Sequence, residues 1–125
     1  MKYLGLAYFT PEKFAAMAPV DVKTLVNQCP PLDERMRATG KVLVSASLAD
    51  TKSWVTLLPD RGRTRVSDGP YTESKEVVGG IFIIDADSRD EAIRIASMHP
   101  AASLGEKGGW AVELITMDFF LASRE

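Results

Sequence analysis

The sequence predicts a mixed α+β domain in which short apolar strands alternate with amphipathic helices. Two short runs, at residues 3–9 and 81–84, are apolar on both faces, which is typical of strands in the middle of a sheet. In other segments the apolar residues recur every three or four positions, the spacing of one face of a helix. The chain has 125 residues, so residues 1–125 are expected to form a single domain.

Residues 3–9 are the first expected strand, and the segment 10–39 after it is expected to be helical. Thr10 is a suitable capping residue, and Pro11 fits the first helical position. Pro19 is expected to separate this short first helix from a longer second one.

Two adjacent prolines, Pro30 and Pro31, lie in the middle of the second expected helix. Proline lacks the backbone N–H of the helical hydrogen bond, and its ring clashes with the preceding turn. A kink or a restart of the helix is therefore expected at this point. Gly40 is suited to end the helix.

Four segments then complete the middle of the chain. Residues 42–48 are expected to form a strand, and residues 53–58 and 63–66 a hairpin that extends the sheet. A long polar loop, residues 67–76, precedes the buried strand at 81–84.

The end of the chain predicts one more helix and one more strand. Ser88 and Glu91 have the spacing of a capping box. An apolar stripe follows at Ala92, Ile95, Ala96 and His99. Pro100 is expected to end this helix, and residues 110–116 form the last strand.

This order of elements predicts a ferredoxin-like βαββαβ sandwich with an added β-hairpin. The central strands are apolar on both faces, but two main helices can cover only one face. A second copy of the chain is expected to cover the other face, so the functional unit is expected to be a homodimer.

Composition excludes several classes of function. The formal net charge is -2, so there is no basic field for nucleic acid or an anionic membrane. The single cysteine, Cys29, excludes an internal disulfide and a multi-cysteine metal site. No glycine-rich phosphate loop and no enclosing set of carboxylates is evident, so no cofactor and no metal are expected. The absence of a long apolar run or a signal peptide pattern favours the cytoplasm.

The polar loop at 67–76 is the most informative segment, because a simple connection between strands is usually shorter. Gly69 and Pro70 predict a turn that would hold Asp68, a candidate general acid or base. Tyr71 and Lys75 would then orient a ligand. The alternative is a solvated connector in which Asp68 caps its own turn.

Charged and titratable residues elsewhere have two interpretations each. Glu113 lies on an otherwise apolar strand face, so it is either held in a pocket with a raised pKa or exposed at the sheet edge. Arg61, Arg63 and Arg65 form either a charged edge that prevents aggregation or a clamp for an anionic ligand. His99 is the only histidine, and at the end of a helix its cationic form is expected to be favoured. Its role is then either structural or catalytic.

The cysteine, Cys29, has no basic neighbour in the sequence. It is interpreted as a small buried apolar side chain rather than as a nucleophile.

The loop sequence Asp68-Gly69-Pro70-Tyr71, followed by Gly79-Gly80 and an apolar strand, resembles the YCII-related family. It is closest to the subgroup named for its Asp-Gly-Pro-Phe motif, with tyrosine here in place of phenylalanine. The opening strand, the helix at 88–100 and the late Val112-Glu113 strand also match. Near Ser45-Ala46-Ser47, where relatives can carry a histidine, this chain has none, and it lacks the Arg-Pro ending of the last strand.

The resemblance implies a ferredoxin-like fold that pairs through its sheets into a dimeric α/β-barrel. It also implies a small bacterial cytoplasmic protein, with a cleft around a His-Asp pair in the wider family. At least one relative is a dechlorinating enzyme of aromatic breakdown, and some subgroup members accompany alternative sigma factors.

Two functions are therefore expected as alternatives. In the first, a cleft near Asp68 binds a small aromatic or anionic molecule and performs lyase-like or dehalogenase-like proton transfer. Asp68 is the catalytic candidate, and the ligand-binding candidates are Tyr71, Glu73, Lys75, Ser47, Arg65 and Glu113. In the second, the dimer is a non-catalytic metabolite sensor or a module that binds a sigma-factor-linked partner. A third reading gives the loop only a role in building the dimer.

Overall fold

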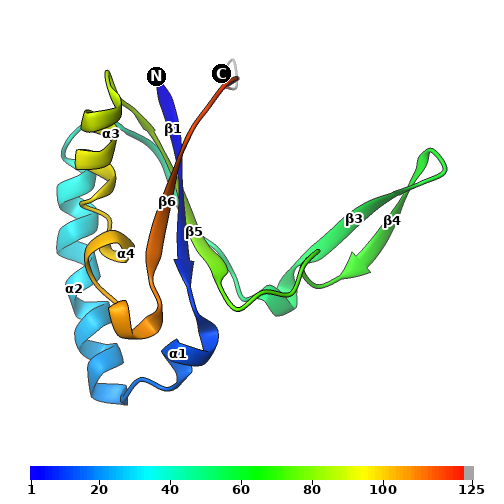
Figure 1. Ribbon diagram of the computed structural model, residues 1–125, viewed down its shortest axis with the longest axis horizontal. Helices are drawn as coiled ribbons and strands as arrows, with labels where there is room; N and C mark the ends of the chain where they lie inside the picture. The colour runs from blue at the N-terminus through cyan, green and yellow to red at the C-terminus, as the bar shows by residue number, and fades with distance from the viewer. Residues whose placement is uncertain (123–125) are drawn as a thin grey trace.

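The computed structural model describes residues 1–122 as a four-stranded antiparallel sheet, a layer of helices on one face, and a separate two-stranded arm (Figure 1). The strands and helices are, in chain order, β1 (Lys2–Phe9), α1 (Pro11–Ala15), α2 (Pro19–Arg37), β2 (Val42–Ser47), β3 (Val55–Asp60), β4 (Arg63–Asp68), β5 (Val77–Asp85), α3 (Arg89–Ala96), α4 (Pro100–Ser103) and β6 (Ala111–Thr116), with short 3-10 turns η1 (Thr51–Ser53) and η2 (Glu106–Gly108). The main sheet has the order β2-β5-β1-β6, and each neighbouring pair is antiparallel. The predicted mixed α+β class is confirmed.

The core lies between the sheet and its helices, and β1 and β5 supply its centre. Phe82 and Ile84 of β5 are fully buried, and they pack with Ile95 of α3 and Met36 of α2. The Phe82 ring lies directly over Gly5 of β1, where even a methyl group would collide with it. Glycine is therefore required at this point of the central strand, because only its missing side chain admits the ring.

Helix α2 runs without interruption through Pro30 and Pro31. The expected restart is therefore wrong. The two prolines donate no hydrogen bond to the carbonyls of Val26 and Asn27, one turn earlier. Both of those residues are exposed, so water can replace the missing donors.

The predicted capping box of α3 is confirmed. The Ser88 hydroxyl accepts a hydrogen bond from the Glu91 backbone N–H at 3.1 Å, and the Glu91 carboxylate accepts one from the Asp87 N–H at 3.1 Å. The buried stripe of the helix is Ala92, Ile95 and Ala96, as expected. The helix ends at Ala96, and Pro100 begins α4 in the first helical position rather than only ending α3.

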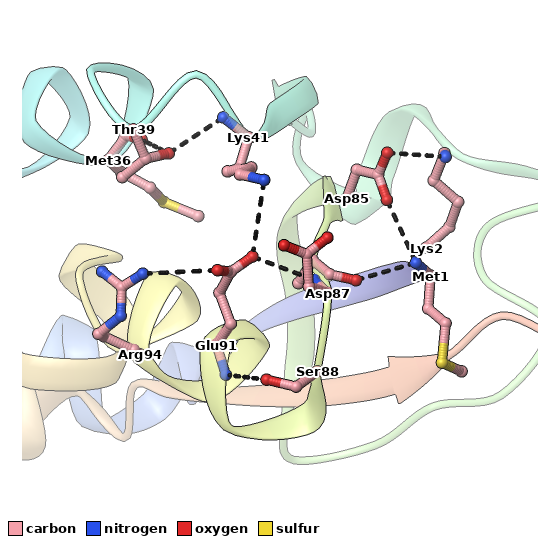
Figure 2. A network of polar contacts seen from close by, with 11 residues as sticks. Met1, Lys2, Met36, Thr39, Lys41, Asp85, Asp87, Ser88, Glu91 and Arg94 are labelled. Carbon is pink, nitrogen blue, oxygen red and sulfur yellow. Dashed lines mark hydrogen bonds and ion pairs between the residues drawn. The ribbon is translucent and has the colours of Figure 1, made fainter.

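Polar contacts join the start of β1, the end of β5 and α3 at one end of the sheet (Figure 2). Asp85 pairs with the Lys2 ammonium at 3.0 Å and with the chain's terminal ammonium at 3.3 Å, and both hydrogen bonds lower the pKa of this carboxyl. Glu91 pairs with Lys41 at 3.7 Å and with Arg94 at 3.9 Å. Ion pairs this accessible to solvent contribute little to stability.

The predicted hairpin is confirmed as β3 and β4, but the expected extension of the main sheet is wrong. The two strands form a sheet of their own, called the arm (55–68) below. The arm leaves one end of the main sheet on the side away from the helices (Figure 1). Its turn places Arg61 and Gly62 at φ of 52° and 81°, the left-handed pair of a tight hairpin turn.

The chain changes direction just before the arm, and hydrogen bonds between near neighbours in the sequence hold this turn. The Asp50 carboxylate accepts a hydrogen bond from the Lys52 N–H at 2.9 Å, and the Trp54 indole donates to the Ala49 carbonyl at 2.9 Å. These contacts build the η1 turn and lead the chain away from the edge of β2.

The face of the sheet opposite the helices, called the open face below, has no layer over it within residues 1–122. Its side chains are mainly aliphatic. They include Leu4, Leu6, Val44, Ile81, Ile83 and Ile115. Among the helices of the described chain, none is long and apolar enough to cross a bilayer.

Candidate functional site

A cavity of about 430 Å³ lies between the sheet and the segments that carry α1, α2 and α4. Its floor is formed by β2 and β5, through Ser45, Ser47 and Gly80. Helix α2 contributes Cys29 and Asp33 to the wall. We call this space the His99 cavity, because the single histidine of the chain lines it.

Two glycines at the floor of the His99 cavity leave space that a side chain would fill. A side chain at Gly80 would come within 3.1 Å of the Ala46 carbonyl, and one at Gly79 within 3.0 Å of the Phe9 ring. The register between β1 and β5 shifts at this position, between Ala7 and Tyr8. Gly79-Gly80 therefore acts through packing and backbone geometry.

Aromatic rings close one end of the cavity. Phe14 packs edge-on against Phe9 with ring centroids 6.2 Å apart, and it stacks on Trp110 at 6.3 Å. The Thr10 backbone N–H donates to the Gly108 carbonyl at 3.0 Å, which holds α1 beside the loop before β6. This end of the cavity is suited to a flat apolar group.

His99 is fixed from two sides. Its Nδ1 accepts a hydrogen bond from the backbone N–H of Ala101 at 3.0 Å, so the side chain caps the start of α4. Its ring stacks on the buried Phe82, with centroids 5.0 Å apart and planes 18° apart.

The expectation that a helix end favours the cationic form of His99 is wrong. The helix before it ends at Ala96, and His99 stands at the beginning of the next one. Burial lowers the pKa of His99 below its ordinary value, while the nearby Asp33 acts weakly in the opposite direction.

Asp33 is a site residue that the sequence analysis did not single out. The uninterrupted helix α2 places it one turn after Cys29, on the same side of the helix. The signal was the four-residue spacing of Cys29 and Asp33, which is meaningful only if the helix continues through Pro30 and Pro31.

Cys29 agrees with its interpretation as an unreactive side chain. Its thiol donates to the Leu25 carbonyl at 3.4 Å. Burial, together with the Asp33 charge, raises the pKa of the Cys29 thiol. The thiol therefore stays protonated near neutrality and is a poor nucleophile.

Apart from His99 itself, only Ser47 of the residues predicted to form a site lines the His99 cavity. Asp68 and Arg65 lie on β4 in the arm, and both are exposed. Asp68 stands opposite Val55 of β3, and the next residue, Gly69, donates its N–H to the Trp54 carbonyl at 2.7 Å.

The motif loop after the arm is also exposed. Tyr71 is 78% exposed, and Lys75 also points to solvent. Glu73 lines a second hollow of about 540 Å³ together with Trp54 and Pro70. Within residues 1–122 of one chain, the predicted site residues are thus spread over the cavity, the arm, this loop and the open face rather than brought together.

The remaining predicted residue, Glu113, lies on the open face. Its carboxylate accepts a hydrogen bond from the Tyr8 hydroxyl at 3.0 Å, and this bond raises the pKa of Tyr8. Glu113 is exposed, which matches the edge interpretation within a single chain. Tyr8 lines both the His99 cavity and the second hollow, so it separates the two.

Comparisons with known proteins identify the family. The family model described as the YCII-related domain matches residues 1–116. An uncharacterised protein of Rhizobium meliloti is 30% identical over 96 residues, which are 77% of each chain. The chain therefore belongs to the YCII-related domain family, as its loop and strand motifs predicted.

A solved structure also resembles this chain. It is the 5-chloro-2-hydroxyhydroquinone dehydrochlorinase of Burkholderia phenoliruptrix, described in complex with 2,5-dihydroxybenzoquinone. The match covers 94% of both chains at 19% identity, with a TM-score of 0.48.

Proposed function

We propose that this YCII-related protein binds a small organic molecule in the His99 cavity and exchanges protons with it. One observation carries the proposal: the only histidine of the chain lines a cavity of about 430 Å³. That volume is within the usual range for small-molecule sites. A histidine is the side chain whose ordinary pKa lies closest to neutrality.

Acid/base chemistry is the reaction type that the cavity favours. His99 is neutral near pH 7, since burial lowers its pKa. Asp33 supplies a carboxylate in the same space. An elimination of the lyase or dehalogenase kind begins when a base removes a proton, and the cavity supplies the Asp33 carboxylate for that role beside an imidazole that can polarise the ligand. The aromatic rings at its end favour an aromatic ligand.

This proposal moves the site away from Asp68, which remains a separate prediction. The two locations are distinguished by a thermal-shift screen of the intact protein with phenols, aromatic acids and chlorinated hydroquinones. A ligand of the native state raises the unfolding midpoint by mass action. We expect His99→Asn and Asp33→Asn to reduce the ligand-dependent rise and to abolish any turnover of the bound compound.

Asp68→Asn is the matched control, because it makes the same chemical change outside the cavity. It is expected to keep the ligand-dependent rise of the wild type. Loss of the rise in Asp68→Asn, with retention in the two cavity variants, would contradict the proposal and favour the arm.

We also propose a homodimer, with the ferredoxin-like sheets facing one another in a dimeric α/β-barrel. Two surfaces support it. The open face is aliphatic, and the arm exposes Val55, Leu57 and Val66 to between 59 and 63%. Exposed apolar areas of this kind mark association surfaces.

A non-catalytic role is the second candidate, and the exposed motif loop favours it. Tyr71 presents an aromatic ring to solvent, outside both hollows. Such a ring suits contact with a protein, a sigma-factor-linked one included, or with a sensed metabolite. Ligand binding without turnover, together with loss of a stoichiometric partner in Tyr71→Ser, would favour this function over the first.

A further inference from the structure

The hydrogen bond at His99 fixes which nitrogen of the ring carries the proton. Nδ1 accepts from the Ala101 backbone N–H at 3.0 Å. A backbone N–H can only donate, so Nδ1 must be the unprotonated nitrogen. The neutral ring therefore carries its proton on Nε2.

The other nitrogen, Nε2, has open space beside it, and we assign that space to the cavity. No residue among 1–122 forms a hydrogen bond with it. In the same part of the chain, every fully buried side-chain nitrogen and oxygen has a hydrogen-bond partner. Because Nε2 has none, it is not fully buried and is in contact with open space. Since His99 lines the cavity, that space is the cavity.

The ring cannot easily turn round to offer its other nitrogen. A flip would leave the Ala101 N–H facing a second N–H, and the stacking on Phe82 restricts tilting. Leaving a partly buried N–H without its acceptor is costly. His99 therefore offers the cavity a hydrogen-bond donor and no acceptor.

The other polar groups of the cavity complement this donor. An ionised Asp33 carboxylate can only accept, whereas the Ser45 and Ser47 hydroxyls can do both. A phenol alone satisfies Asp33 but gives His99 no strong acceptor. A carbonyl alone satisfies His99 but gives Asp33 no donor.

Building on the proposed function, we infer that the cavity is specific for a hydroxy-carbonyl compound on a flat ring. Its carbonyl oxygen accepts from His99 Nε2–H, and its hydroxyl donates to Asp33. The ring lies toward Phe14 and Trp110. His99 keeps its proton and stabilises the negative charge on the carbonyl oxygen with this hydrogen bond, while Asp33 is the group that takes the proton of the hydroxyl.

The first test reads the tautomer directly by ¹⁵N NMR of the imidazole. His99 is the only histidine, so its two ring nitrogens give one unambiguous set of signals. We expect the proton on Nε2 and an unprotonated Nδ1 in the free protein near pH 7.5. A proton on Nδ1 would overturn the inference whatever the ligand, and it would leave the proposed function standing.

The second test compares three probes by NMR titration: 3-hydroxybenzaldehyde, 3-methylphenol and benzaldehyde. The first probe carries both groups, and each of the others lacks one. One satisfied hydrogen bond contributes about 1 kcal/mol, so we expect the first probe to bind about fivefold more tightly than either of the others.

His99→Asn is the decisive variant. Its side-chain oxygen can still accept from the Ala101 N–H, because asparagine is a good capping residue, but it has no group in the place of Nε2. We expect it to bind 3-hydroxybenzaldehyde no better than 3-methylphenol. Ser103→Ala, on α4 outside the cavity, should keep the wild-type preference.

The outcomes separate the two ideas. Equal binding of all three probes to the wild type would overturn the specificity and keep the cavity as a binding site. If no probe shifts the signals of cavity residues, both the proposed function and the inference fail.

Discussion

The main sheet and the arm are both antiparallel and both carry large apolar side chains, yet they bury very different amounts of surface. Phe82 and Ile84 of the sheet are fully buried, whereas Leu57 and Val66 of the arm are 63% exposed. The arm pairs without a break in register, whereas the β1–β5 pairing of the sheet even shifts register between Ala7 and Tyr8. The difference is therefore the helix layer, because packing rather than the backbone ladder supplies most of a sheet's stability.

The largest effect that tests this comparison comes from truncation of the two kinds of apolar side chain. Phe82→Ala is expected to lower the free energy of unfolding by about 3–5 kcal/mol, since it leaves a cavity in the core. Leu57→Ala in the arm is expected to change it by less than about 0.5 kcal/mol. Urea unfolding followed by circular dichroism measures both. With the protein dilute enough to be monomeric, a loss at Leu57 close to that at Phe82 would show that the arm is already packed within one chain.

The second test asks whether the arm takes part in self-association. If a second copy covers it, Leu57→Lys should weaken self-association by about tenfold, an effect of about 1.4 kcal/mol. Sedimentation equilibrium measures the dissociation constant. Val20→Lys on α2 is the control, because Val20 is similarly exposed at 68% but lies on the helix side.

A wild-type protein that remains monomeric at high concentration would contradict the homodimer. Equal weakening by both lysine variants would instead place the interface on the helices.

The smallest effect is a pH dependence confined to the helix side. Burial lowers the pKa of His99, so the unfolded chain binds this proton more readily than the folded chain does. The free energy of unfolding should therefore fall as the pH falls through the ordinary histidine value of about 6.5. The slope should stay below about 1.4 kcal/mol per pH unit, the limit for one proton.

His99→Asn should remove this slope. The other titratable groups of the cavity are Asp33, Cys29 and Tyr8, whose ordinary pKa values lie outside this range. Urea unfolding at pH 5.5 to 7.5 measures the slope. An unchanged slope in the variant would assign the proton to another group.

Local signals in the sequence identified most of the elements. The Ser88 capping box depends on residues three positions apart, and the Arg61-Gly62 turn depends on two adjacent ones. Both patterns act within one turn of chain, so they are readable without the fold. The family motif in the loop after the arm was readable in the same way.

Long-range features were not readable. Pro30 and Pro31 are strong local signals against a helix, yet α2 continues because tertiary packing buries Leu25 before them and Met36 after them, Met36 within the core cluster. The meeting of Asp33 and His99 in one cavity depends on that continuation, since the two residues lie far apart in sequence.

The sequence by itself determined a small mixed α+β chain of the YCII-related family, with strands apolar on both sides. Its residues carry that information locally, through periodicity, caps and the loop motif. Only the tertiary structure decided that the hairpin stands apart as an arm, and that His99 rather than Asp68 lines a cavity. The physical reason is that a cavity and a free surface are properties of how elements pack, and packing joins residues that the chain order keeps apart.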